Sequence, residues 1–152
     1  MNPVTREWIK KAEGDFSIAC REMRARKAPN YDGVCFHAQQ CAEKYLKARL
    51  HTAGVRFSKT HDLGVLIDLA KKIEPEWEVV RPAARMLTDF AVRFRYPGAF
   101  ATKTQAREAV KACELFRERA RMVLRLAARP TKKPSSKKSR AKSVTTKRRK
   151  RS

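Results

Sequence analysis

The stretch YDGVCFHAQQCAEKYLKARLHTAG, residues 31–54, carries the longest amphipathic helix pattern in the chain. Small and apolar residues recur at spacings of three and four, which places them on one broad face of a helix. They are Val34, Cys35, Ala38, Cys41, Ala42, Tyr45, Leu46 and Ala48. The opposite side is left to His37, Gln40, Glu43, Lys44 and Lys47. So wide a face with so many small residues predicts a helix packed between other helices, and Gly54 is expected to end it as a C-terminal cap.

The segment before this stretch predicts another amphipathic helix. Asn2-Pro3 marks its start, because proline at the first helical position loses no hydrogen bond. Apolar residues keep helical spacing to about residue 26, and Pro29-Asn30 then breaks the pattern. Because the connection is short, the two helices are expected to pack as an antiparallel hairpin.

Three further helical segments follow residue 54. Asp62 is placed to cap the first of them. The second ends at Phe94, and Pro82 predicts a kink or a restart within it. The residues TKTQ, 102–105, have the form of a capping box for the last helix, which should stop by Pro130. Nothing in the chain alternates with the period of a strand, so the predicted fold is all-α, an antiparallel up-and-down bundle of four to five helices.

Composition changes sharply near the C-terminal end. Residues 130–152 hold eleven of the 37 Lys and Arg residues and no Asp or Glu, in a chain of net charge +22. Such a segment buries too little apolar surface to offset its chain entropy, so we predict a helical domain over residues 1–129 and a disordered basic tail over residues 130–152. The tail is expected to bind the phosphates of RNA or DNA through counterion release, unless it serves only solubility. Its cations are Lys132, Lys133, Lys137, Lys138, Arg140, Lys142, Lys147, Arg148, Arg149, Lys150 and Arg151.

The remaining composition narrows the class of protein. The four cysteines stand apart without a CxxC pair and fall among apolar helix positions, which indicates reduced core residues in a cytoplasmic protein. His37 and Cys41 have the spacing to share a metal, but no second pair of ligands accompanies them, so we expect no metal site and no cofactor. No run approaches the about 18 apolar residues of a membrane span, and the first residues lack the apolar core of a signal peptide. No membrane association is expected.

Three motifs together resemble the signature of the HEPN domain family. HAQQCAEKYLKARL, residues 37–50, is similar to the family's FHxQQAxEKxxKAxL helix. His61-Asp62-Leu63 opens the next helix, and Arg95-Tyr96-Pro97 ends the helix after that. The resemblance implies a helical bundle that binds nucleotides, forms a homodimer and pairs with a small nucleotidyltransferase-domain protein, in the manner of a toxin and its antitoxin.

A cluster of polar residues around these motifs is the first candidate site. Its predicted nucleotide- and phosphate-binding residues are Lys44, Lys47, Asp62, Arg93, Arg95 and Tyr96. Cations near helix ends hold phosphates, and Tyr96 is able to stack on a base. The alternative is structural: Arg95 would pair with Glu43 or Asp62 and tie the helices together.

Arg56 and His61 form the second candidate site. They match the R-x4-6-H spacing that ribonuclease members of the family carry, in which the histidine moves protons and the arginine steadies phosphate charge. In those members the motif lies near the final helices, and no such motif follows Arg95 here. A binding and interaction module is therefore the preferred interpretation, and a metal-independent endoribonuclease toxin using Arg56 and His61 is the alternative.

Overall fold

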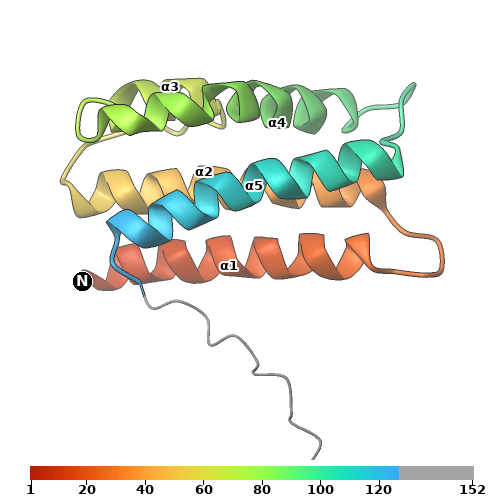
Figure 1. The fold of residues 1–152 in the computed structure, drawn as a ribbon, viewed down its shortest axis with the longest axis horizontal. Coiled ribbons are helices and arrows are strands. Elements are labelled where there is room, and N and C mark those ends of the chain that lie inside the picture. Colours follow the sequence, from red (N-terminus) through yellow and green to blue (C-terminus); the bar gives the residue numbers. More distant parts are fainter. Residues whose placement is uncertain (127–152) are drawn as a thin grey trace, which may run out of the picture.

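Helix α2 (Tyr31–Thr52) is the centre of the structure, which is a computed structural model. It contacts α1 (Pro3–Met23), α3 (Leu63–Ala70), α4 (Arg81–Arg93) and α5 (Lys103–Val123). In Figure 1, α2 and α5 lie between α1 on one side and α3 with α4 on the other, and α1 and α2 run in opposite directions. The predicted antiparallel hairpin and the central place of α2 are both confirmed.

The structure describes residues 1–126, and these contain no strand. The all-α bundle predicted from the sequence is confirmed. In this part of the chain no helix is long and apolar enough to span a bilayer. The predicted domain boundary at residue 129 and the tail cations from Lys132 to Arg151 lie outside the described residues.

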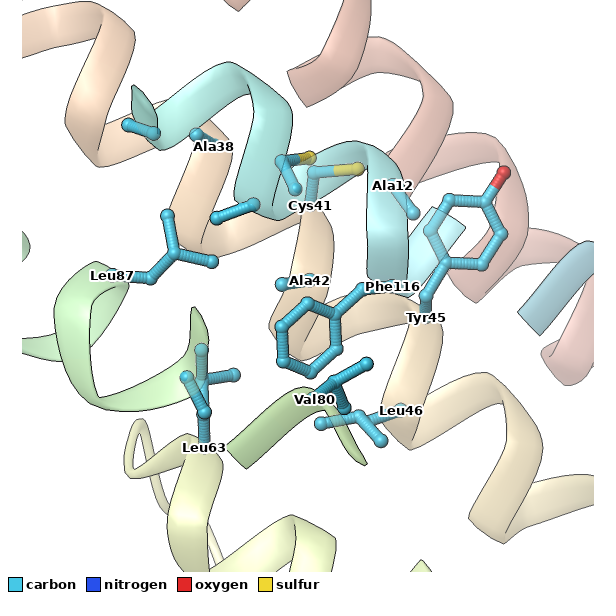
Figure 2. Close-up of a cluster of buried hydrophobic side chains, with 14 of the residues drawn as sticks. Ala12, Ala38, Cys41, Ala42, Tyr45, Leu46, Leu63, Val80, Leu87 and Phe116 are labelled. Carbon is cyan, nitrogen blue, oxygen red and sulfur yellow. The ribbon is translucent and has the colours of Figure 1, made fainter. Parts of the chain in front are cut away.

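The buried face of α2 is wider than its apolar pattern. Figure 2 shows Ala38, Cys41, Ala42, Tyr45 and Leu46 of this helix within the core, together with Phe116 of α5. Gln39, Glu43 and Lys47 are buried as well, with exposed fractions of 2%, 2% and 6%. The sequence placed Glu43 and Lys47 on the side opposite the apolar face, and this side is buried too, because helices and a loop cover α2 on nearly every side.

Local signals explain where the helices begin and end. Gly54 follows α2 with φ of 70° in the left-handed region, and the Val55 N–H donates to the Leu50 carbonyl oxygen at 2.9 Å, as in a glycine-capped C-terminus. The Asp62 carboxylate caps α3 by accepting from the Gly64 N–H at 2.8 Å. Both caps were predicted from the sequence.

The second half of the bundle restarts at a proline, as predicted. A 3-10 helix, η1 (Pro75–Val80), precedes α4, and Pro82 then occupies the first turn of α4, where a missing N–H costs nothing. The capping box of α5 is present between Thr102 and Gln105. This helix ends at Val123, earlier than the limit of residue 130, and Arg125 after it has φ of 52°.

The cysteines lie in the helices as reduced thiols. Cys35, Cys41 and Cys113 are buried, whereas Cys20 is half-buried. Burial raises the pKa of Cys35 to about 12, with a smaller contribution from the charge of Asp32. Burial and the contact with the Cys113 thiol also raise the pKa of Cys41. These thiols behave as packing residues.

Candidate functional site

Glu43 is the hub of a buried polar network on α2. Its carboxylate accepts a hydrogen bond from Lys47 Nζ at 2.6 Å and lies 3.1 Å from His61 Nδ1. The amide nitrogens of Gln39 and Gln40 donate to it at 3.2 Å and 3.3 Å. Gln39 also donates to the backbone carbonyl of His61 at 3.0 Å. Both the ring and the backbone of His61 are thus fastened to α2.

Lys47 is held inside this network. Its ammonium lies 5.6 Å from the centre of the Trp8 ring and 5.8 Å from that of Phe57, so two aromatic faces and one carboxylate surround the charge. A buried charge requires such partners. The structure gives Lys47 a position in the core, away from the surface where a phosphate would be bound.

His61 is the exposed member of the network, with 76% of its side chain accessible. With Nδ1 against a buried carboxylate, the imidazole is oriented and its Nε2 is left for solvent or a ligand. This is the arrangement of a general base or acid. The sequence analysis named His61 as a candidate catalytic residue but did not pair it with Glu43. The signal that was available is the position of Glu43 in the motif of residues 37–50, which precedes the His61-Asp62-Leu63 motif.

The structure does not join Arg56 to His61. Arg56 is exposed and lines a shallow groove with His51, Gly54, Val55 and Phe57. Within residues 1–126, no hydrogen bond or ion pair connects the two side chains.

Lys44 belongs to a different cluster, between α2 and α1. Asp15 of α1 is 7% exposed and accepts from Lys44 Nζ at 2.5 Å, while His37 Nδ1 lies 2.8 Å from its other oxygen. Nδ1 of His37 is thus directed at Asp15 of α1, and the described residues contain no group of three side chains suited to a metal ion.

Arg93, Arg95 and Tyr96 gather at one end of the bundle. The C-terminal end of α4 and the start of α2 border a groove of about 430 Å³. It is lined by Asn30, Asp32, Gly33, Phe36, His37, Phe90, Ala91, Phe94 and Arg95. The Arg95 guanidinium lies over the Phe36 ring at 5.7 Å and does not pair with Glu43 or Asp62, so the structural alternative raised for Arg95 is wrong.

Arg93 and Tyr96 lie at the same end of the bundle as Arg95. Arg93 lies over the rings of Phe90 and Phe94 and pairs with Asp89. The Tyr96 side chain is exposed. Of the six predicted phosphate-binding residues, the structure brings these three together and places Lys44, Lys47 and Asp62 elsewhere. The aromatic lining of the groove was missed, although Phe36 directly precedes the HAQQ motif.

The partly buried carboxylate of Glu13 joins α1 to α2 and α5. Glu13 accepts hydrogen bonds from Arg117 at 2.8 Å and 3.1 Å, from Arg121 at 3.2 Å and from the Tyr45 hydroxyl. Burial works against ionisation of Glu13, but the hydrogen bonds from Arg117 and Tyr45 and the two arginine charges lower its pKa. Burial and the contact with Glu13 raise the pKa of Tyr45. The cluster links α1, α2 and α5 and stabilises their packing.

Comparison with known proteins adds a family and two related folds. A family model described as the HEPN domain matches residues 5–123. The solved structure of TT1696 from Thermus thermophilus is 23% identical, with a TM-score of 0.62, and the match covers 78% of this chain and 96% of that one. ST0689, described as an archaeal HEPN homologue, is also 23% identical with a TM-score of 0.62, over 79% and 97%. At this identity the likeness shows the fold, and no curated protein matches.

Proposed function

The chain belongs to the HEPN domain family, and from that premise we propose that it is a binding and interaction module for nucleotides or nucleic acids. Its partner in this proposal is a small nucleotidyltransferase-domain protein of the cytoplasm, in a toxin-antitoxin-like pair. The observation that carries the nucleotide part is the groove at the end of α4, where Arg95 lies over Phe36.

The chemistry of this groove suits a nucleotide. Arg95 is exposed, and in the described residues no carboxylate lies within ion-pair distance of its guanidinium. A guanidinium without an acidic partner binds phosphate through directed hydrogen bonds. Phe36, Phe90 and Phe94 give the groove an aromatic lining for a base.

Support for a homodimer comes from a second surface, formed by η1 and α5. Val79, Leu115 and Met122 are 73%, 51% and 67% exposed and border one groove of about 270 Å³. Exposed apolar side chains that cluster in this way are typical of protein contact sites. Sedimentation of the full chain should give twice the chain mass, and substitution of Leu115 by Glu should return it to the monomer. A monomeric wild-type chain would refute the dimer.

The module is tested by isolating the full chain from its native cells. A nucleotidyltransferase-domain protein should co-elute and be identified by mass spectrometry. Binding of nucleotides is measured by calorimetry, and Arg95→Gln should weaken it while Arg6→Gln, an exposed arginine at the start of α1, leaves it unchanged. Absence of both partner and nucleotide binding would overturn the proposal.

A ribonuclease is the second candidate, favoured by the contact between His61 and Glu43. In this proposal the exposed imidazole moves the proton of an RNA 2′-hydroxyl, and Glu43 orients it. Purified protein is incubated with cellular RNA at low salt. Cleavage that is lost in His61→Ala and retained in His51→Ala would replace the binding module with the ribonuclease. Cleavage that persists in His61→Ala would exclude His61 as the catalytic group.

A further inference from the structure

All the exposed aromatic side chains of the described residues lie at one end of the bundle. Among Phe, Tyr and Trp, only Phe36, Tyr96 and Phe100 are exposed, with 37%, 62% and 84% of their surface accessible. Phe36 is on the first turns of α2, and the other two are in the connection between α4 and α5. Figure 1 shows this connection and the one between α1 and α2 at the same end. We call this surface the bundle end.

The exposure of Phe100 follows from how its neighbours are held. The Ala101 N–H donates to the Asp32 carboxylate on α2 at 2.6 Å, and Ala101 is 8% exposed. The capping box at Thr102 fixes the next residue. Gly98, with φ of 112°, turns the chain just before. Phe100 therefore projects from a segment that is fastened on its C-terminal side, which lowers the entropy lost when a ligand packs on the ring.

Positive charge surrounds these rings. Six exposed cations at this end have no carboxylate within ion-pair distance in the part of the chain that the structure describes. They are Arg24, Arg26, Lys27, Arg95, Lys103 and Arg107. They come from both connections and from the start of α5, so the charge is spread across the whole end.

This combination distinguishes among nucleic-acid ligands. Aromatic side chains stack on bases whose faces are open, as they are in single strands, whereas a duplex hides those faces. The cations here are dispersed over several turns of chain and would contact more phosphates than one mononucleotide carries, so among the proposed nucleotide and nucleic-acid ligands they favour a strand. Dispersed cations match the successive phosphates of a strand.

We propose that the bundle end binds single-stranded nucleic acid, with unpaired bases stacked on Phe36, Tyr96 and Phe100 and the strand's phosphates on the surrounding cations. The inference rests on the proposed function and names its ligand class and surface. It places the specificity for single strands in the helical domain rather than in residues 130–152.

The test uses the full chain and fluorescein-labelled 12-nucleotide oligouridine, with a duplex RNA of equal length as the comparison. Fluorescence anisotropy is measured at moderate salt, where contacts made by charge alone are weakened. Phe100→Ala and Tyr96→Ala should each weaken binding of the single strand at least about fivefold, the low end of the effect of losing one stacked base. Duplex binding should not change. Val4→Ala, at an exposed apolar residue at the start of α1 and so at the opposite end of the bundle, should leave both affinities unchanged.

Several results would overturn the inference. One is single-strand affinity that is unaltered in both aromatic variants, with circular dichroism confirming that they fold. Another is an equal loss for duplex and single strand. Displacement of the strand by micromolar ATP would assign the surface to a mononucleotide, and a change of sedimentation mass in Phe100→Ala would assign it to a protein contact.

Co-elution of the partner separates this inference from the proposed function. If the wild-type chain shows no preference for single strands but still recovers a nucleotidyltransferase-domain protein, the inference fails and the module stands. If single strands bind as described and no such protein co-elutes, the inference stands and the partnership fails.

Discussion

Glu43 joins four polar side chains of the bundle in one network. It neutralises the buried ammonium of Lys47, accepts from two glutamines and orients His61. Removing one member of a buried ion pair leaves the other charge without compensation, which costs far more than the pair contributes.

Glu43→Ala should therefore lower the free energy of unfolding by about 3–5 kcal/mol, because Lys47 would remain buried and unpaired. Urea denaturation followed by circular dichroism measures the change. Asp89→Ala is the matched control, since the ion pair of Asp89 with Arg93 is about half exposed and should contribute less than about 1 kcal/mol. A loss below about 1 kcal/mol in Glu43→Ala would mean that water reaches Lys47.

Glu13 predicts a pH dependence of stability. Its folded pKa lies below the ordinary value of 4.5, so its ionised form stabilises the fold above that pH and the contribution is lost as the pH falls through the folded pKa. Glu13→Gln should melt at a lower temperature than the wild type near neutral pH, and the gap should close in acid.

Thermal melts at a series of pH values provide the measurement, with Glu118→Gln as the control. Glu118 is exposed and has no ion pair in the described residues, so its variant should follow the wild type at every pH. A Glu13→Gln gap that stays constant down to strong acid would contradict the assignment of the effect to ionisation.

Among the helices, α2 and α5 show that local signals set the helix boundaries, whereas packing sets much of the helix stability. The caps decide where each helix begins and ends, whereas the stability of α2 comes from the helices that surround it. α5 depends more on its capping box, because its N-terminal turn is exposed at Lys103 and Thr104.

Thr102→Ala should lower the free energy of unfolding by about 1 kcal/mol, because the Gln105 N–H loses its side-chain acceptor. Thermal denaturation measures the loss. Thr104→Ala, two residues into the same helix, is the control and should be neutral or slightly stabilising, since alanine is the better helix former. Equal effects of the two substitutions would indicate that the cap does not stabilise α5.

On the scale of the whole molecule, the chain combines a helical bundle with eleven cations after residue 129. Charge of that density binds polyanions without reading their sequence, whereas the bundle end offers stacking. The two contributions differ in their response to salt.

A chain that ends at residue 129 should lose most of its salt-sensitive retention on RNA while keeping its helicity by circular dichroism. The slope of log affinity against log salt concentration should become shallower by several units, with an upper bound of about eight for eleven contacts to a single strand. A chain in which those eleven Lys and Arg residues are replaced by Ser controls for length. Unchanged retention in both would show that the cations of residues 130–152 do not contact RNA.

The sequence by itself determined the fold class and most of the helix boundaries. Gly54, Asp62, Pro82 and Thr102 acted as local signals, because capping and the backbone angles of glycine and proline depend on a few neighbouring residues. Helical periodicity likewise identified the core face of α2.

Only the tertiary structure decided which polar residues meet. The burial of Glu43 and Lys47 and the position of Arg95 over Phe36 depend on how helices distant in sequence are rotated against one another. The separation of Arg56 from His61 depends on the course of the loop between α2 and α3. Helical spacing assigns a residue to a side of its own helix, but the side that becomes buried is set by the partners that pack against it.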